Sequence, residues 1–172
     1  KLTEDQQAFQ KTARDFAQSE LPEAAQICET EASPPTHELI RKYGEMGFLG
    51  INVPEEYGGL GLGNIDALIV LEEFAKISSA IAFPVFESCV GPVKAIEHFA
   101  EESLKKRVIP EVCSGEKIVA VAMSEPDAGS ALTDLKTKGR VTNDKVILNG
   151  LKRWCSGGGH ADGYVVYLSL IH

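Results

Sequence analysis

The chain of 172 residues has few cysteines and histidines, four of each, and neither type clusters at a ligand spacing. No two cysteines form a C-x-x-C pair, which argues against a disulfide framework and favours a reducing compartment. The scattered histidines likewise predict no metal site. The positions are Cys28, Cys89, Cys113, Cys155, His37, His98, His160 and His172.

Long hydrophobic runs and net positive charge are also missing. No apolar run approaches the roughly 20 residues of a membrane-crossing helix, so we expect no membrane span. The opening "KLTEDQQAFQ" lacks the basic-then-apolar layout of a signal peptide. The formal net charge of −8 argues against a nucleic-acid partner. A phosphorylated ligand stays compatible with this charge, because loop N–H groups attract phosphate without cationic side chains.

Helical periodicity dominates the chain before residue 117. Thr3 and Gln6 form a capping-box pattern, which predicts a first helix, and Pro22 predicts a break in it. Thr36 predicts the start of a second helix that stops at Gly47. The apolar segment 64–89 predicts a buried helix begun by Asn64. The segment 91–115 predicts two short helices, with Ser103 capping the second and Ser114-Gly115 ending it.

The texture alternates after Lys117, with β-branched and aromatic residues between turn signals. Asn143-Asp144 and Asn149-Gly150 both suit tight turns, and Asn-Gly is the strongest hairpin signal. We therefore predict an α+β fold, a helical bundle over 1–117 followed by the first strands of an antiparallel β-barrel domain over 118–172. About 55 residues are too few for a closed barrel, so the β part is expected to be cut short.

Three stretches carry unusual composition. "GFLGINVPEEYGGLGLGN" is rich in glycine but also in acids, which favours an irregular structural loop over a phosphate cradle. "AVAMSEPDAGSALTDLKT" runs from an apolar strand into a short polar loop, which by itself reads as an ordinary turn. "NGLKRWCSGGGHADGYVV" holds the single tryptophan beside three glycines. A lone tryptophan is usually a core residue.

Together, and in this order, the three stretches resemble the acyl-CoA dehydrogenase superfamily over essentially the whole chain. "GFLGINVPEEYGGLGL" is similar to the family's G-x-P-E-x-Y-G-G-x-G loop. "AMSEPDAGSALTDLKT" is similar to its T/S-E-P-x-A-G-S-D signature, and "LNGLKRWCSGGG" to its N-G-x-K-x-W-I-T-N-G strand pair. The resemblance implies FAD as cofactor.

The resemblance also implies roles for individual residues. Residues 121–124, which we call the first flavin motif, would run along the flavin. Their hydrogen-bond donors would face the part of the ring where negative charge develops. Gly129 and Ser130 would meet the FAD phosphates, and Ser130 would also touch the substrate. In the second motif, Trp154 would flank the isoalloxazine and Ser156 would bond near flavin N5. The implied cofactor-binding residues are Val121, Ala122, Met123, Ser124, Gly129, Ser130, Trp154, Cys155 and Ser156.

Three residues depart from the family pattern. Ala131 stands where the family has Asp, which puts the loop contacts beyond Ser130 in doubt. Cys155 replaces a common Ile and Gly157 a common Asn, both at the flavin wall. We interpret Cys155 as a small apolar filler rather than a redox thiol. Glu125 lies within the flavin motif, where its family role is structural, so we do not assign it as the catalytic base.

The activity implied by the resemblance is α,β-desaturation of an acyl-CoA thioester, with hydride transfer to flavin N5. The family's catalytic glutamate usually lies in a C-terminal four-helix domain, so we expect the chain to be the front of a longer protein or a split subunit, without a catalytic residue of its own. The implied partners are an acyl-CoA substrate, an electron-transfer flavoprotein and further copies in a homodimer or homotetramer. The expected compartment is the bacterial cytoplasm, with the mitochondrial matrix as the alternative.

Other functions stay open on the same residues. An acyl-CoA oxidase or a flavin monooxygenase would use the same scaffold, because fold does not settle chemistry. A non-catalytic subunit of a heteromeric acyl-CoA dehydrogenase is a second alternative, and a helical interaction module without ligand is a third. The helices between Asp66 and Ala100 are predicted to floor an acyl pocket, with Phe86 either lining it or packing the bundle.

Overall fold

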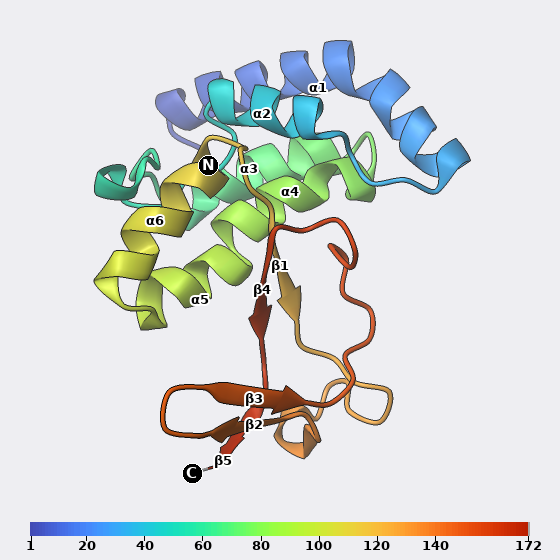
Figure 1. Ribbon diagram of the computed structural model, residues 1–172. Helices are drawn as coiled ribbons and strands as arrows, with labels where there is room; N and C mark the ends of the chain where they lie inside the picture. Colours follow the sequence, from blue (N-terminus) through green and yellow to red (C-terminus); the bar gives the residue numbers. More distant parts are fainter. Residues whose placement is uncertain (172) are drawn as a thin grey trace.

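A computed structural model describes residues 1–171, so His172 lies outside the described residues. Six α-helices form the first part of the chain and five short strands the second (Figure 1). This arrangement confirms the predicted fold class, a helical region followed by a few strands. The bounds are α1 Glu4–Glu31, α2 His37–Glu45, α3 Asn64–Ala75, α4 Ser79–Cys89, α5 Pro92–Phe99, α6 Glu102–Cys113, β1 Val119–Ala122, β2 Lys138–Val141, β3 Val146–Asn149, β4 Gly163–Val166 and β5 Ser169–Ile171.

The capping signals at the first two helices are confirmed. Thr3 Oγ1 accepts a hydrogen bond from Gln6 N at 3.2 Å, and Gln6 Oε1 accepts one from Thr3 N at 3.1 Å. Thr36 caps α2 in the same way, accepting from Leu39 N. The break predicted at Pro22 is wrong, because α1 continues through this residue. Buried Leu21 and Cys28 on either side of Pro22 anchor the helix to the core, and this packing offsets the lost hydrogen bond.

The apolar segment predicted as one helix is two. Ser78 interrupts it and caps α4, accepting a hydrogen bond from Ala80 N at 3.3 Å. Asn64 is the first residue of α3 rather than its cap, since Gly63 is the cap and Asp66 accepts from its N–H. Two short helices follow as predicted, but Glu101 rather than Ser103 occupies the cap position of α6.

The glycine-rich loop is structural, as predicted. It holds one 3₁₀ turn, η1 Glu55–Tyr57, and packs against α6. Gly58 has φ +83°, a conformation that favours glycine. Gly59 has no room for a side chain, because an added Cβ would lie 2.1 Å from Val53 O. The glycines therefore serve close backbone packing.

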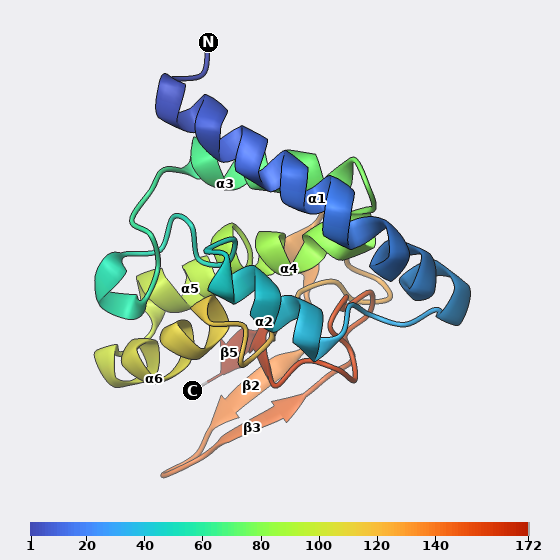
Figure 2. The ribbon, with the colours of Figure 1, turned by 90° about the horizontal axis from the view of Figure 1, so that it is seen from above.

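The helical core is built around aromatic rings. Phe16, Tyr43, Phe48 and Phe74 meet with ring centroids 5.0–5.9 Å apart, in tilted, edge-on and stacked geometries. Such pairs add to the free energy gained from burying their apolar surface. The cluster joins α1, α2 and α3 with the segment after α2 in one hydrophobic core. Seen from above, α1 lies across α3 (Figure 2).

The strands pair in two small groups. β2 and β3 form the antiparallel hairpin predicted at Asn143-Asp144, and β5 adds to β2 in parallel. β1 pairs with β4 in parallel, because β4 returns after a long excursion instead of a tight turn. The hairpin expected at Asn149-Gly150 is wrong. Gly150 there has φ +159° and packs against Thr137, and the chain runs on toward Trp154.

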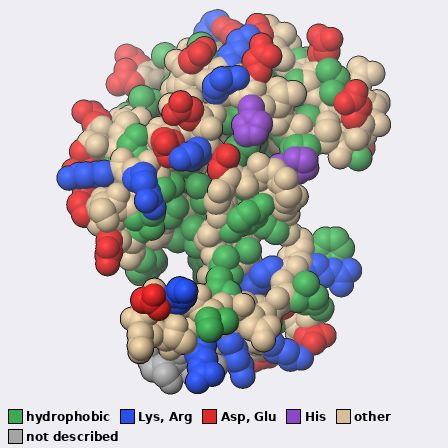
Figure 3. All heavy atoms as spheres, in the orientation of Figure 1, with side chains coloured by type: hydrophobic (Ala, Val, Ile, Leu, Met, Phe, Trp, Pro, Cys, Tyr) green, Lys and Arg blue, Asp and Glu red, His purple; other side chains and the backbone are tan. Residues whose placement is uncertain are grey.

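The β part contacts the helices through β1 and β4 (Figure 1). β1 packs against α4 and α5, and β4 packs against α5. A hollow separates the two parts on the face shown in Figure 3. One stretch, Ser79–Phe99, has the length and composition of a membrane-crossing helix. In the structure it is α4 and α5, bent at Val90–Gly91 and half buried inside the protein, and a core helix satisfies the same criterion.

Candidate functional site

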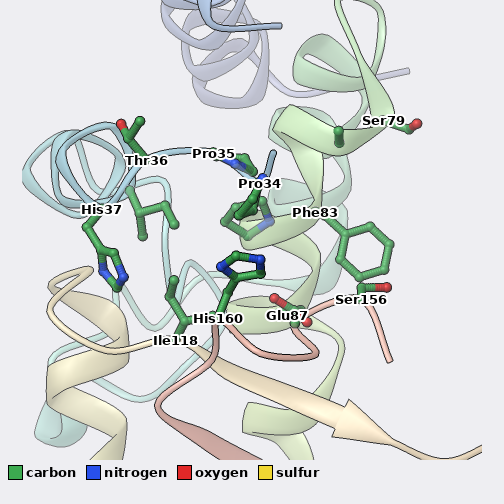
Figure 4. A pocket seen from close by; sticks show the side chains of 14 residues that line it. Pro34, Pro35, Thr36, His37, Ser79, Phe83, Glu87, Ile118, Ser156 and His160 are labelled. Atoms are coloured by element: carbon green, nitrogen blue, oxygen red, sulfur yellow. The ribbon is translucent and has the colours of Figure 1, made fainter. Parts of the chain in front are cut away.

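A cavity of about 540 Å³ lies between the helices and the β part, within the size range of small-molecule sites. Its walls come from four regions: the start of α2 with the segment that leads into it, one face of α4, Ile118 just before β1, and the loop that follows Trp154 (Figure 4). Ile40 and Phe83 make much of the wall apolar, whereas Glu87, Ser156 and His160 bring polar groups to it.

The loop after β1 begins with a tight turn. Glu125 N donates to Ala128 O at 2.8 Å and Ala128 N donates back to Glu125 O at 3.2 Å. In the described part of the chain, the N–H groups of Ser124 and Ser130 have no recorded acceptor. Ser130 is exposed and Ser124 partly so. The loop therefore presents free backbone donors and hydroxyl groups.

Glu125 holds this loop to two other segments. Its buried carboxylate accepts hydrogen bonds from the N–H groups of Lys136 (2.6 Å) and Thr137 (2.9 Å) and from Lys152 Nζ (2.9 Å). Lys152 Nζ also donates to Met123 O at 2.9 Å. The hydrogen bond from Lys152, then that from Thr137, lowers the pKa of Glu125 to about 2. A carboxylate saturated in this way is structural, as we interpreted it from the sequence.

The two stretches that stood apart in the sequence lie side by side. Arg153 N donates to Ser124 O at 2.9 Å, and Cys155 Sγ donates to Val121 O at 3.2 Å. Burial raises the pKa of the Cys155 thiol, so its thiolate is disfavoured at neutral pH. This environment agrees with Cys155 as a filler rather than a nucleophile.

Trp154 is on the surface, with 77% of its area exposed, against the ordinary expectation for a lone tryptophan. Its backbone has φ +60°, a strained value for a residue with a side chain. The Arg153 guanidinium lies 4.3 Å from the ring centroid, at a distance where a cation attracts the ring face. Strain of this kind persists where the surrounding structure imposes it, often at ligand sites.

Gly157 explains one departure from the family pattern. An added Cβ would lie 2.5 Å from the Ala120 Cβ and 3.0 Å from that of Ala161. The loop also closes through Tyr164, whose hydroxyl donates to Gly157 O at 3.0 Å and accepts from Gly159 N at 3.1 Å. The backbone here approaches β1 too closely for an asparagine.

Family profiles cover nearly the whole chain. The profile described as "Acyl-CoA dehydrogenase, N-terminal domain" matches residues 3–116, and "Acyl-CoA dehydrogenase, middle domain" matches residues 120–170. The chain belongs to the acyl-CoA dehydrogenase family. The resemblance seen in the sequence is thereby confirmed.

Individual relatives agree with this membership. Mitochondrial isovaleryl-CoA dehydrogenase of Bos taurus is 35% identical over 96% of the chain and 39% of its own length. A solved glutaryl-coenzyme A dehydrogenase in complex with glutaryl-CoA is 34% identical, with TM-score 0.90, covering 96% of this chain and 42% of that one. An acyl-CoA dehydrogenase of Bacillus anthracis complexed with FAD is 29% identical, with TM-score 0.87, covering 98% and 29%. The chain spans about two fifths of the curated relatives' length.

In this member of the acyl-CoA dehydrogenase family, seven of the nine predicted cofactor residues fall into two adjacent groups. The first group is the end of β1, Val121 and Ala122, with the two residues after it, Met123 and Ser124. It lies against the second group, Trp154, Cys155 and Ser156, through the hydrogen bonds given above. Gly129 and Ser130 sit farther along the exposed loop, where an added Cβ on Gly129 would meet nothing within 4 Å. Their roles toward a ligand stay predictions.

Sequence reasoning missed Glu87. It is 7% exposed, lines the cavity from α4, and its Oε1 has no hydrogen-bond partner among the described residues. The available signal was that Glu87 is the single charged residue of helix α4. The aromatic residue at the cavity is Phe83, whereas Phe86 packs against Phe83 with centroids 5.3 Å apart and is not part of the wall. Within residues 1–171, no group of three or more metal-ligating side chains comes together.

Proposed function

We propose that the protein containing this chain is an FAD-dependent acyl-CoA dehydrogenase that desaturates an acyl thioester between its α and β carbons. One observation carries the proposal. Two flavin motifs, 121–124 and 153–156, lie side by side, and Ser156 of the second motif lines a largely apolar cavity. Family membership and the FAD-bound relative support the same reading.

The residues present fit a flavin. Ser124 and Ser130 offer backbone N–H groups without acceptors in the described chain, and such donors suit an anionic or electron-rich ligand edge. The exposed ring of Trp154 offers a flat apolar face for a fused ring system. FAD, when bound, supplies the acceptor for the hydride that leaves the β carbon.

This chain's own part in the reaction is positioning. The backbone N–H and the hydroxyl of Ser124 would stabilise negative charge that develops on the cofactor. Ser156 would bind the edge of the cofactor that lies nearest the cavity. The apolar wall at Phe83 and Ile40 would exclude water from the acyl chain. We assign removal of the α-proton to a carboxylate outside this chain. The pKa of that carboxylate would lie in the range that general acid–base catalysis requires.

The electrons must then leave the reduced protein, and we propose an electron-transfer flavoprotein as their acceptor. A homodimer or homotetramer and a bacterial cytoplasmic or mitochondrial matrix location complete the proposal, on the analogy of the family. An acyl-CoA oxidase or a flavin monooxygenase would differ in passing electrons to oxygen. A non-catalytic subunit would bind the thioester without being reduced by it.

The experiment uses the full-length protein, purified and titrated anaerobically with acyl-CoA thioesters while the visible flavin absorbance is followed. We expect a yellow protein whose absorbance bleaches with substrate and recovers with electron-transfer flavoprotein. Ser156→Ala should weaken FAD retention or shift its reduction potential. Rapid recovery in air with hydrogen peroxide release would identify an oxidase. A colourless protein that takes up no FAD on reconstitution would refute the proposal.

A further inference from the structure

Glu87 is the unexplained feature of the cavity. Its side chain reaches the wall from α4 and, in Figure 4, lies between Phe83 of the same helix and His160 of the opposing loop. It is 93% buried, since 7% of its area is exposed, and Oε1 has no hydrogen-bond partner within residues 1–171. A buried acid in this state is unfavourable unless a partner arrives.

The neighbouring ionisable groups do not supply that partner. His37 and His160 line the same cavity, and the structure records no hydrogen bond from either to Glu87 in the described chain. Lys117 lines a small space behind Glu87, but its Nζ pairs with Glu111 at 2.7 Å. The cause of the raised pKa of Glu87 is burial, with no cation lowering it.

A ligand in the cavity would decide whether Glu87 is satisfied. A hydrocarbon chain would fill the space beside Phe83 and Ile40 and leave the carboxyl unpaired, which weakens binding. A hydroxyl or an amide both donates and accepts, so it pairs with the carboxyl whether or not the carboxyl carries a proton. A carboxylate on the ligand accepts only, so it would pair with the protonated acid and be repelled by the ionised one.

We propose that Glu87 is a specificity-determining residue, and that the cavity takes acyl-CoA thioesters whose acyl chain carries a hydroxyl or amide group where it reaches Glu87. This inference rests on the proposed function, in which the cavity is the acyl pocket. A site built to pair with a polar group discriminates against the analogue that lacks it, because the buried acid then stays unpaired.

The test measures binding, with activity as a second readout. Full-length wild-type protein, Glu87→Gln and Glu87→Leu are titrated calorimetrically with pairs of thioesters that differ in a terminal hydroxyl against a terminal methyl. Pairs of several chain lengths are used. Wild type should prefer the hydroxyl member of one pair by about tenfold, the effect of one satisfied buried hydrogen bond. Glu87→Gln should keep the preference within about threefold, and Glu87→Leu should abolish or reverse it.

Phe83→Leu is the matched control, since it changes the same wall without touching the acid. It should change both affinities of a pair together and keep their ratio. A wild-type preference for the methyl member at every length would overturn the inference without any variant. So would a preference in Glu87→Leu equal to that of wild type, or tightest binding of a carboxylate-ended chain such as glutaryl-CoA.

The two proposals fail in different ways. If wild type binds FAD and is bleached by plain acyl-CoA but ignores the terminal hydroxyl, the assignment of Glu87 falls and the enzyme stands. If it binds neither FAD nor any thioester, the proposed function falls, and the inference falls with it.

Discussion

Replacing Glu87 by glutamine should remove a pH dependence from the stability of the protein. The carboxyl lies in an apolar wall without a partner for Oε1 among the described residues, and burial raises its pKa from 4.5 to about 7. Glutamine has the same shape and does not titrate. The comparison of the two proteins therefore isolates the ionisation of one side chain.

The sign follows from proton binding. Between pH values of about 4.5 and 7 the folded protein holds a proton on Glu87 that the unfolded chain has released. The contribution of Glu87 to the free energy of unfolding is therefore fully present below the unfolded pKa and is lost as pH rises through the folded pKa. The difference between the two pKa values corresponds to about 3 kcal/mol, at about 1.4 kcal/mol per pH unit.

Urea unfolding of the ligand-free full-length protein would measure this. The stability of Glu87→Gln minus that of wild type should be about 2 kcal/mol larger at about pH 8 than at about pH 5. His37 and His160, which line the same cavity, are present in both proteins. Glu72→Gln, at a side chain 64% exposed, is the control for the same substitution at the surface. A stability difference between Glu87→Gln and wild type that does not change with pH would refute the reasoning, because it would mean that Glu87 is paired or hydrated in solution.

Three further predictions concern residues that lie next to the flavin motifs or farther along the same loop. Ser130→Ala should weaken FAD and acyl-CoA binding by about 1 kcal/mol each, one neutral hydrogen bond, and unchanged affinities in titration would remove Ser130 from the site. Gly157→Asn should lower the free energy of unfolding by about 1–3 kcal/mol, because its Cβ would lie 2.5 Å from the Cβ of Ala120. Adding Ala120→Gly to this variant should restore part of the loss, as measured by thermal unfolding. Glu125→Gln should accelerate hydrogen exchange at the Thr137 N–H, because the Glu125 carboxylate accepts a hydrogen bond from it at 2.9 Å. The pKa of Glu125 is lowered, so its stabilising effect should persist until the pH falls toward about 2. Unchanged protection of the Thr137 N–H would contradict the proposed role of this hydrogen bond.

Local signals in the sequence were sufficient for many elements. The capping box at Thr3 and Gln6, the cap at Thr36 and the turn at Asn143-Asp144 each depend on residues three or fewer positions apart. Such interactions form within a few residues of chain, so spacing predicts them. The same reasoning failed at Pro22, because the local cost of proline inside α1 is outweighed by packing from α3 and its neighbours.

The candidate site also combines features that the sequence predicted with features that it did not. The motifs around Ser124 and Trp154 placed the chain in its family, and they predict which residues face a flavin. The sequence did not show that Arg153 N donates a 2.9 Å hydrogen bond to Ser124 O, 29 residues earlier in the chain. It also did not show that an exposed tryptophan would result, since Trp154 is held outward by a strained backbone rather than by its own hydrophobicity.

By itself the sequence determined the fold class, the family and the order of the motifs, because caps, turns and short motifs carry their information locally. The tertiary structure alone decided the parallel return of β4 beside β1, the exclusion of a side chain at Gly157, and the unpaired state of Glu87. Each of these depends on which distant segment lies opposite. Burial and the presence of a partner are set by that neighbour, and no spacing along the chain encodes it.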